Sequence, residues 1–393
     1  MNDFRFRGLT AKSVQEINRG VILRLIYERR LCSRSEIVQS SGLDASTVTR
    51  VVQQLVDDCI VEESILQKVE NQRGRRSIGL RMAADPHRVL VVRLQRLNFK
   101  VAMLDLTGSI LKSIEIPVES VSTAENIFDH IVESLNSFLE LCRENLVGIG
   151  VTLPGPFLED SERIVLITES PDWHQFDLIQ RLREHYRNIP VYSKHDAKAA
   201  ALAVWISQGL DSKSQVTLYL SAGQGIGSGL VLNGNVFKGS LGTAGEIGHT
   251  SIDLNGPLCR CGNNGCLELY TSSLALLRNL GEDWQNISSK PISFEEVVVA
   301  YKNRHPSVVK EVARVAEYLA QGLVNSINLM NPDLIVIGDE YTKFGESFLE
   351  SIKTHIQKKI LLSVFKNINF QLAPQTDLVI GGSFHHVIQN ELL

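Results

Sequence analysis

The first sixty residues carry apolar side chains at helical spacing in consecutive segments. Residues 15–30 place four of them at intervals typical of one buried helical stripe: Ile17, Val21, Leu25 and Ile26. The run Ser-Arg-Ser-Glu at 33–36 is a capping box, which predicts the start of a second, short helix. Gly42 follows at a position suited to a left-handed turn. Two short helices joined by a glycine-containing turn are therefore expected.

A third helix is predicted from Asp44, whose side chain can cap it, to about residue 60. Its buried stripe consists of Val48, Val51, Val52 and Leu55. The polar side chains left facing outward are Ser46, Thr47, Thr49, Arg50, Gln53 and Gln54. This layout is typical of a helix-turn-helix, in which the start of the last helix enters the major groove of DNA. The alternative is a three-helix packing module with a solvated face.

The next segments, 61–69 and 77–82, predict a β-hairpin. At its tip Arg73, Arg75 and Arg76 flank Gly74. Guanidinium groups on a loop suit DNA phosphates and the narrow minor groove of A·T-rich DNA, although a basic loop tip can also be merely solvated. Together the hairpin and the helices predict a winged helix-turn-helix DNA-binding domain over residues 1–82.

From about residue 88 the pattern alternates short β-branched runs with amphipathic helices. This alternation predicts an α/β fold with mixed sheets. The expected strands are 89–94, 100–106, 146–153, 216–223, 228–234 and 333–339, with long helices at 125–144 and 307–330 among the segments between them.

Length and charge add little to this picture but exclude some classes of protein. The 393 residues are too many for one ordinary core, and no apolar stretch approaches the length of a membrane span. The start of the chain lacks the apolar core of a secretory signal, so a cytoplasmic protein without membrane insertion is expected. The net charge of −4 divides into +3 over residues 1–80 and −7 over the rest. A mildly basic head on an acidic body agrees with DNA binding by the head.

One cluster of residues carries metal chemistry. His249, Cys259, Cys261 and Cys266 offer the four ligands of a closed, tetrahedral, structural Zn²⁺ site, and leave no open position for an activated water. Their order, one histidine and then C-x-C-x4-C, is not that of a zinc finger. The surrounding CRCGNNGC is polar and glycine-rich, which makes an apolar core an unsuitable alternative.

This ligand order, with GEIGH before it and CLE after it, resembles the ROK family of repressors, open reading frames and kinases. The resemblance covers roughly residues 15–390. It implies a two-lobed, actin-like (ribonuclease H-like) ATPase fold behind the winged helix-turn-helix. The expected division is a head at 1–82, a first lobe at 83–195 completed by about 375–393, and a second lobe at 196–374 with the zinc site and the oligomerisation surface.

The family divides into sugar kinases and sugar-responsive repressors, and the nucleotide side of this chain departs from the kinases. Their first strand ends in an Asp-x-Gly-Gly-Thr turn, whereas residues 92–98 lack both aspartate and glycine. Arg93 and Arg96 could contact an anion there but cannot form that tight turn. The glycines of 223–229 are kept, but the adenosine-side Ile-Gly-Gly is Ile-Gly-Asp, in which Asp339 adds bulk and negative charge.

The sugar side agrees better with the family. Asp196 stands at the position of the kinases' catalytic base, and His195 before it is the residue found in repressors of the Mlc/NagC type. The resemblance also places Glu246, Glu268 and His249 around a sugar, near a Pro-Gly loop at 152–156. Carboxylates suit polyols, whose hydroxyl groups are all potential donors.

These features predict a transcriptional regulator of the Mlc/NagC type, most simply a repressor of sugar uptake or metabolism genes. It is expected to bind a pseudo-palindromic operator as a homodimer or tetramer, and to sense a sugar, a sugar phosphate or a phosphotransferase-system protein through a catalytically inactive ROK domain. Asp196 is then a vestigial base. One departure is Arg76, where the family's wing has a proline. The alternative is an active ATP-dependent ROK sugar kinase with a DNA-binding head.

Overall fold

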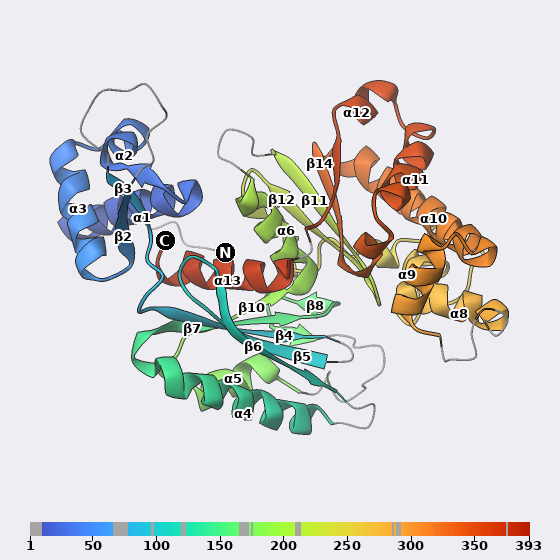
Figure 1. The fold of residues 1–393 in the computed structure, drawn as a ribbon, viewed down its shortest axis with the longest axis horizontal. Coiled ribbons are helices and arrows are strands. Elements are labelled where there is room, and N and C mark those ends of the chain that lie inside the picture. Colours follow the sequence, from blue (N-terminus) through green and yellow to red (C-terminus); the bar gives the residue numbers. More distant parts are fainter. Residues whose placement is uncertain are drawn as a thin grey trace.

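The computed structural model (Figure 1) describes residues 10–393 with gaps at 66–77, 96–97, 119–122, 165–172, 174–175, 209–213, 285–286, 288–291 and 375. The tip of the expected wing, with Arg73, Arg75 and Arg76, lies outside the described residues, as does Arg96.

The head (residues 10–65 and 78–82) contains three helices and a small sheet. The helices are α1 (Ala11–Arg29), α2 (Arg34–Ser41) and α3 (Ala45–Asp57), and the sheet has the order β1 (Cys32–Ser33), β3 (Ile78–Met82), β2 (Val61–Ile65). The capping box of Ser33 and Glu36 is formed, and Gly42 has a φ of 70°. Strands β2 and β3 are antiparallel. The three helices and the paired strands of the hairpin are confirmed.

The apolar stripe of α1 was predicted only in part. Ile26 is fully buried, but Ile17 and Val21 are 50% and 39% exposed. The side chains that fill the core from this helix are Ile22, Leu23, Ile26 and Tyr27. The difference arises because the body packs against one side of α1, the side that carries Ile22, Leu23, Ile26 and Tyr27.

The first large sheet has the order β10 (Val191–His195), β7 (Leu146–Leu153), β4 (Arg88–Leu94), β5 (Asn98–Leu104), β6 (Ile110–Pro117). Strands β10, β7 and β4 are parallel, and the β4–β5–β6 pairs are antiparallel. Leu90 and Val92 pack in one core with α4 (Ala124–Cys142) and α5 (Leu178–His185). Val89 and Val91 point to the other face, where α13 (Leu378–Glu391) lies.

The second large sheet has the order β13 (Asn235–Val236), β12 (Ile226–Leu232), β11 (Val216–Ala222), β14 (Leu334–Gly338), β15 (Asn369–Leu372). One face packs on α6 (Asp196–Ser207). The other face packs in a core with α8 (Ser273–Trp284), α9 (Phe294–Lys302), α10 (Pro306–Met330) and α11 (Glu346–Gln357). The mixed sheets and all six expected strands are confirmed.

Smaller elements complete the described chain. They are the strand pair β8 (Phe157–Leu158) and β9 (Arg163–Ile164), and the short helices α7 (Glu268–Thr271) and α12 (Leu362–Lys366). No helix in the described part of the chain combines the length and apolar character needed to cross a membrane.

Helices α6 and α13 cross at the centre of the molecule, between the two large sheets (Figure 1). A Cβ atom added at Gly382 of α13 would lie only 1.8 Å from the carbonyl oxygen of Ala199 in α6. The backbones of the two helices therefore touch, and this contact requires glycine.

Replacing Gly382 with alanine is expected to destabilise the protein by about 1–3 kcal/mol, because the added methyl group meets rigid backbone. The matched control is its neighbour: a Cβ at Gly381 meets only Ala203 Cβ at 3.8 Å. Gly381→Ala should therefore be neutral or stabilise by up to about 1 kcal/mol, the helix-propensity difference. Urea denaturation of both variants measures the difference, and equal midpoints would contradict the close crossing.

The head is joined to the body by the far half of α13. The hydroxyl of Tyr27 forms a hydrogen bond with Nδ1 of His385, and Arg19 donates to the carbonyl oxygen of Leu392 at 3.4 Å. The head's core residues, such as Ile22 and Leu55, belong to one continuous cluster with Ile380 and Phe384 of α13. The same helix thus lies against the sheet, α6 and the head.

Candidate effector cleft and metal cluster

One cleft of about 460 Å³ lies between the two large sheets. Its walls come from segments far apart in sequence, chiefly the end of β4, the Pro-Gly loop at 154–156, the start of α6 and the β11–β12 turn. All five residues expected around a sugar line it: His195, Asp196, Glu246, His249 and Glu268. The structure therefore brings together the residues that the family resemblance selected.

His195 and Asp196 stand where β10 ends and α6 begins. Nε2 of His195 is 3.5 Å from Asp196 Oδ1 and 3.9 Å from Glu246 Oε1. A Cβ atom at Gly155 would come within 2.3 Å of this Nε2, so glycine is needed for the loop to close over the ring. The Pro-Gly loop and the histidine thus hold each other in place.

Glu246 and Glu268 approach the cleft from the two ends of the cysteine segment. Burial raises the pKa of Glu246, and the nearby His195 and His249 oppose that shift. Glu268 accepts a hydrogen bond from the backbone N–H of Ile226 at 2.9 Å, which ties the start of α7 to the start of β12. The carboxylate of Glu268 is therefore positioned by fixed local structure.

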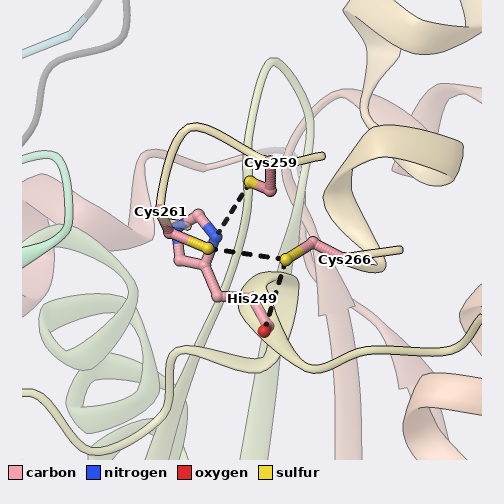
Figure 2. Close-up of side chains that lie close together, drawn as sticks. All are labelled: His249, Cys259, Cys261 and Cys266. Carbon is pink, nitrogen blue, oxygen red and sulfur yellow. Dashed lines mark hydrogen bonds between the residues drawn. The ribbon is translucent and has the colours of Figure 1, made fainter. Parts of the chain in front are cut away.

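The four expected metal ligands form one compact cluster (Figure 2). Their ligand atoms all lie within 4.8 Å of one another. Nδ1 of His249 is 3.8 Å from Sγ of Cys259, and the sulfur atoms of Cys261 and Cys266 are 3.6 Å apart. Zn–S bonds of about 2.3 Å in a tetrahedron require neighbouring ligands to be roughly 3.8 Å apart. The cluster could hold a metal ion of this size.

Glycine geometry shapes the loop that carries these cysteines. Gly265 has a φ of 62°, and a Cβ atom there would lie 1.8 Å from the carbonyl oxygen of Asp253. Short bridges pair Ser251 with Cys266 and Leu258 with Asn264. Burial, reinforced by the neighbouring thiols, raises the pKa of Cys266 well above its usual range.

A network of ion pairs surrounds Arg93, at the end of β4, for which the sequence indicated no partner. Nη1 of Arg93 is 2.9 Å from Oδ1 of Asp377, and its Nη2 is 3.6 Å from Oδ1 of Asp339. Nζ of Lys100 is 3.4 Å from Oδ2 of Asp377. Burial opposes the charge of Arg93, but Asp377, Asp339 and Asp196 outweigh it and raise its pKa. Sequence reasoning missed Asp377, although its position immediately before α13 marks it as a helix cap.

The glycines retained at 223–229, in the β11–β12 turn and the start of β12, include one with a packing role. A Cβ atom at Gly229 would lie 2.3 Å from the carbonyl oxygen of Ala197 in α6. The turn also bonds to the helical side of the lobe, because the N–H of Ser273 donates to the carbonyl oxygen of Gly223. Close approach of α6 therefore accounts for at least one of the retained glycines without a nucleotide.

In the head, the outward face of α3 forms one exposed surface lined by Ala45, Ser46, Thr49, Arg50, Gln53 and Gln54. The short hydroxyl groups have partners within the helix: Ser46 and Thr47 donate to Asp44, and Thr49 donates to the carbonyl oxygen of Ala45. Thr47 is half-buried on the capping side and lies off this surface. Arg50 is exposed and has no ion pair among the described residues.

Curated proteins resemble this chain over most of its length. The xylose repressor of Caldicellulosiruptor bescii is 28% identical over 394 residues, which cover 96% of this chain and 97% of that protein. The DNA-binding transcriptional dual regulator NagC of Escherichia coli is 27% identical over 365 residues, 90% of this chain and 88% of its own.

Solved structures share the fold. A ROK family transcriptional regulator, described as a homolog of the Escherichia coli Mlc protein, superimposes with a TM-score of 0.79 at 24% identity and covers 96% of this chain and 98% of its own. A ROK hexokinase from Thermus thermophilus gives a TM-score of 0.61 at 24% identity, over 76% of this chain and 97% of its own. The two-lobed ROK fold behind a helix-turn-helix, expected from the sequence, is confirmed. Residues 89–377 match the ROK family, and the chain therefore belongs to that family.

Proposed function

We propose that the protein is a sequence-specific DNA-binding transcriptional regulator, most simply a repressor of sugar genes, whose ROK body senses a sugar signal. The observation that carries this proposal is the combination of an exposed α3 face on the head with a carboxylate-lined cleft in the body. The relatives named xylose repressor and DNA-binding transcriptional dual regulator NagC support it, since their matches cover 96% and 90% of this chain and therefore include part of the head.

DNA recognition is assigned to α3 and to the wing. In a helix-turn-helix the start of the second helix meets base edges, and the exposed surface of α3 includes its first residues. We assign base contacts to Ser46, Thr49 and Arg50 on that surface and to Thr47 beside it. Phosphate or minor-groove contacts are assigned to Arg73, Arg75 and Arg76. A homodimer, or a tetramer built from dimers, would present two heads to a pseudo-palindromic operator.

Arg50→Ala is expected to relax the preference for one base pair in each half-site by about 1–3 kcal/mol, the value of a good arginine contact to a base edge. Binding to an operator and to single-base variants, measured by fluorescence anisotropy, tests this. Arg24, an exposed arginine on α1, provides the control: Arg24→Ala removes the same charge and should leave base preference unchanged. Identical base preference in the Arg50 variant and the wild type would exclude direct reading by this side chain.

The effector site is assigned to His195, Asp196, Glu246, His249 and Glu268, which line one cleft. Asp196 sits at the first turn of α6, and its Oδ1 accepts a hydrogen bond from the N–H of Ala197 at 2.6 Å. Its carboxylate can bind a sugar hydroxyl without abstracting the proton. A small sugar, a sugar phosphate, or a phosphotransferase-system protein acting on the same body remain the proposed signals.

We assign a structural Zn²⁺ ion to His249, Cys259, Cys261 and Cys266. The donor set fits this ion, because three thiolates and one imidazole fill a tetrahedron and the spacing of the ligand atoms agrees. The ion would supply the positive charge that three close thiolates need. His249 also lines the cleft, so this residue can serve both sites.

The signal can reach the head through α6 and α13. Asp196 begins α6, and α6 touches α13 at Gly382. The head contacts His385 of α13 and Leu392, the residue that caps this helix. A ligand that favours one arrangement of these helices shifts the population of DNA-binding and non-binding forms. No contact with DNA by the body is required.

The second candidate is an active ROK sugar kinase with a DNA-binding head. The structural likeness to a ROK hexokinase and the retained Asp196 favour it. The ion pairs of Arg93 with Asp339 and Asp377 oppose it, because they place two carboxylates near the position of the transferred phosphates. We therefore propose a body without catalytic activity.

The decisive experiment is selection of random duplex DNA by the purified, zinc-replete protein near physiological salt. Enrichment of a two-fold symmetric site is expected, and a panel of sugars and sugar phosphates is then tested for release of that site. Failure to enrich any sequence would overturn the proposal that the protein is a sequence-specific regulator. Sugar-dependent release of ADP that Asp196→Asn abolishes would establish the kinase instead.

A further inference from the structure

The cleft contains a second group of polar residues, gathered around Arg93. Arg93, Ser221 and the glycine turn at 223–227 border the cleft there. A guanidinium group, a hydroxyl group and a glycine-rich backbone turn are the groups that proteins use to bind phosphate. We call these residues the anion slot.

The chain's own Asp339 lies in the anion slot. Its carboxylate accepts a hydrogen bond from the hydroxyl of Ser221 and lies 3.6 Å from the guanidinium group of Arg93. It also approaches the turn, since a Cβ atom at Gly223 would meet Asp339 Cβ at 3.5 Å. An internal carboxylate thus takes the partners that an external phosphate would use.

The charges around the slot balance without a ligand. Asp377 forms a second ion pair with Arg93 at 2.9 Å, and Lys100 forms an ion pair with Asp377 at 3.4 Å. The two further arginines in the described wall, Arg260 and Arg278, are exposed to solvent, where their attraction is screened. The same wall contains five carboxylates: Asp196, Glu246, Glu268, Asp339 and Glu340.

The backbone at Asp339 indicates that the carboxylate, and not the shape of the chain, closes the slot. Its φ of 64° lies in the left-handed region, which glycine adopts more readily than aspartate. Glycine would fit this position without strain and would leave the slot open. The aspartate therefore costs local backbone energy and contributes a negative charge beside Arg93.

From these contacts we propose that Asp339 makes the cleft selective for an unphosphorylated sugar, by occupying the slot that the phosphate group of a sugar phosphate would need. A phosphate on the hydroxyl nearest Asp196 would enter between Asp196 and Asp339, and both repel it. This inference rests on the proposed effector role of the cleft, and it decides between two of the proposed signals, the free sugar and the sugar phosphate.

The test measures, by isothermal titration calorimetry on the full-length protein, the affinities for D-xylose, D-glucose and N-acetyl-D-glucosamine and for their monophosphate esters. The wild type should bind one parent sugar at least about 100-fold more tightly than its ester, the ratio expected for a phosphate held near two carboxylates. Asp339→Gly and Asp339→Asn should each reduce that ratio by roughly 10-fold or more.

The two variants separate charge from bulk, because asparagine keeps the shape of the side chain and glycine removes it. Asp160→Asn removes a charge from an exposed position outside the cleft wall and should leave the ratio unchanged. Circular dichroism and binding to the selected DNA site report whether each variant is folded.

An ester that binds the wild type as tightly as its parent sugar overturns the inference, and so does a ratio that neither Asp339 variant changes. In either case a sugar or ester that releases the DNA still supports the proposed regulatory function. If neither class of ligand binds while a DNA site is still selected, the effector role of the cleft fails together with the inference. If no DNA site is selected but the parent sugar binds selectively, only the proposed DNA-binding function is overturned.

Discussion

Removal of the metal is expected to unfold the segment between His249 and Cys266 and to abolish the response to the effector. A closed zinc site contributes on the order of 10 kcal/mol to the folding of its own segment, which is several times the effect of a typical single substitution. Glu246 and Glu268 flank the segment, so loss of the ion also releases both carboxylates from the cleft. Hydrogen exchange of residues 247–270 should become fast after treatment with a chelator.

Cysteine variants provide the matched comparison. Cys266 is fully buried within the cluster, whereas Cys59 is exposed and lies in the head. Cys266→Ser should lose about one Zn²⁺ per chain, the whole content of a four-ligand site, and Cys59→Ser should lose none. Metal content is measured by inductively coupled plasma mass spectrometry. A chelated protein that retains slow exchange across 247–270 would show that the cluster folds without an ion.

Neutralising the wing, with Arg73, Arg75 and Arg76 all changed to glutamine, is expected to weaken binding to every DNA sequence by roughly 500-fold at 0.1 M salt. The reason is counterion release: each lost phosphate contact removes about 0.9 from the slope of log K against log salt, so the slope should fall by nearly 3. Anisotropy titrations from about 50 to 300 mM KCl measure both quantities.

A triple variant of the body controls for net charge. Lys302, Arg304 and Lys310 are exposed basic residues on and beside α9 and α10. Changing them to glutamine removes the same charge from the molecule at a distance from α3. The slope of log K against log salt should then stay close to that of the wild type. A wing variant with the wild-type slope would show that the wing makes no contact with DNA phosphates.

The parts of the fold that were predicted well are those in which local pattern and tertiary environment agree. Helix α3 buries the four apolar residues that its spacing selected, and the capping residues Ser33 and Asp44 bond as their positions predicted. The strands of β4 and β7 were found because strands buried on both faces are almost continuously apolar.

Other elements could not be found in this way. Strand β6 is exposed along most of its length, and β10 includes Ser193 and Lys194, so neither has a continuous apolar run. The stripe of α1 was misplaced because the docking of α13, more than 350 residues later, decides which side of α1 is buried.

The candidate site shows the same division. The four metal ligands were selected from sequence because they lie within eighteen residues and their chemistry is distinctive. The network of Arg93, Asp339 and Asp377 joins segments hundreds of residues apart, and no local pattern contains that pairing. Arg93 was recognised as a candidate anion ligand, but its partners depend on how the two large sheets face each other.

The shared core of the head and α13 bears on how such a regulator can change its target genes. Because Ile22, Leu55 and Phe384 lie in one apolar cluster, a head grafted from a relative would meet a surface that it does not fit. Chimeras made by exchanging whole heads should therefore fold poorly unless α13 is exchanged with them. New operator preferences are more readily acquired by substitutions on the outward face of α3, such as Arg50 and Gln53, which take no part in that cluster.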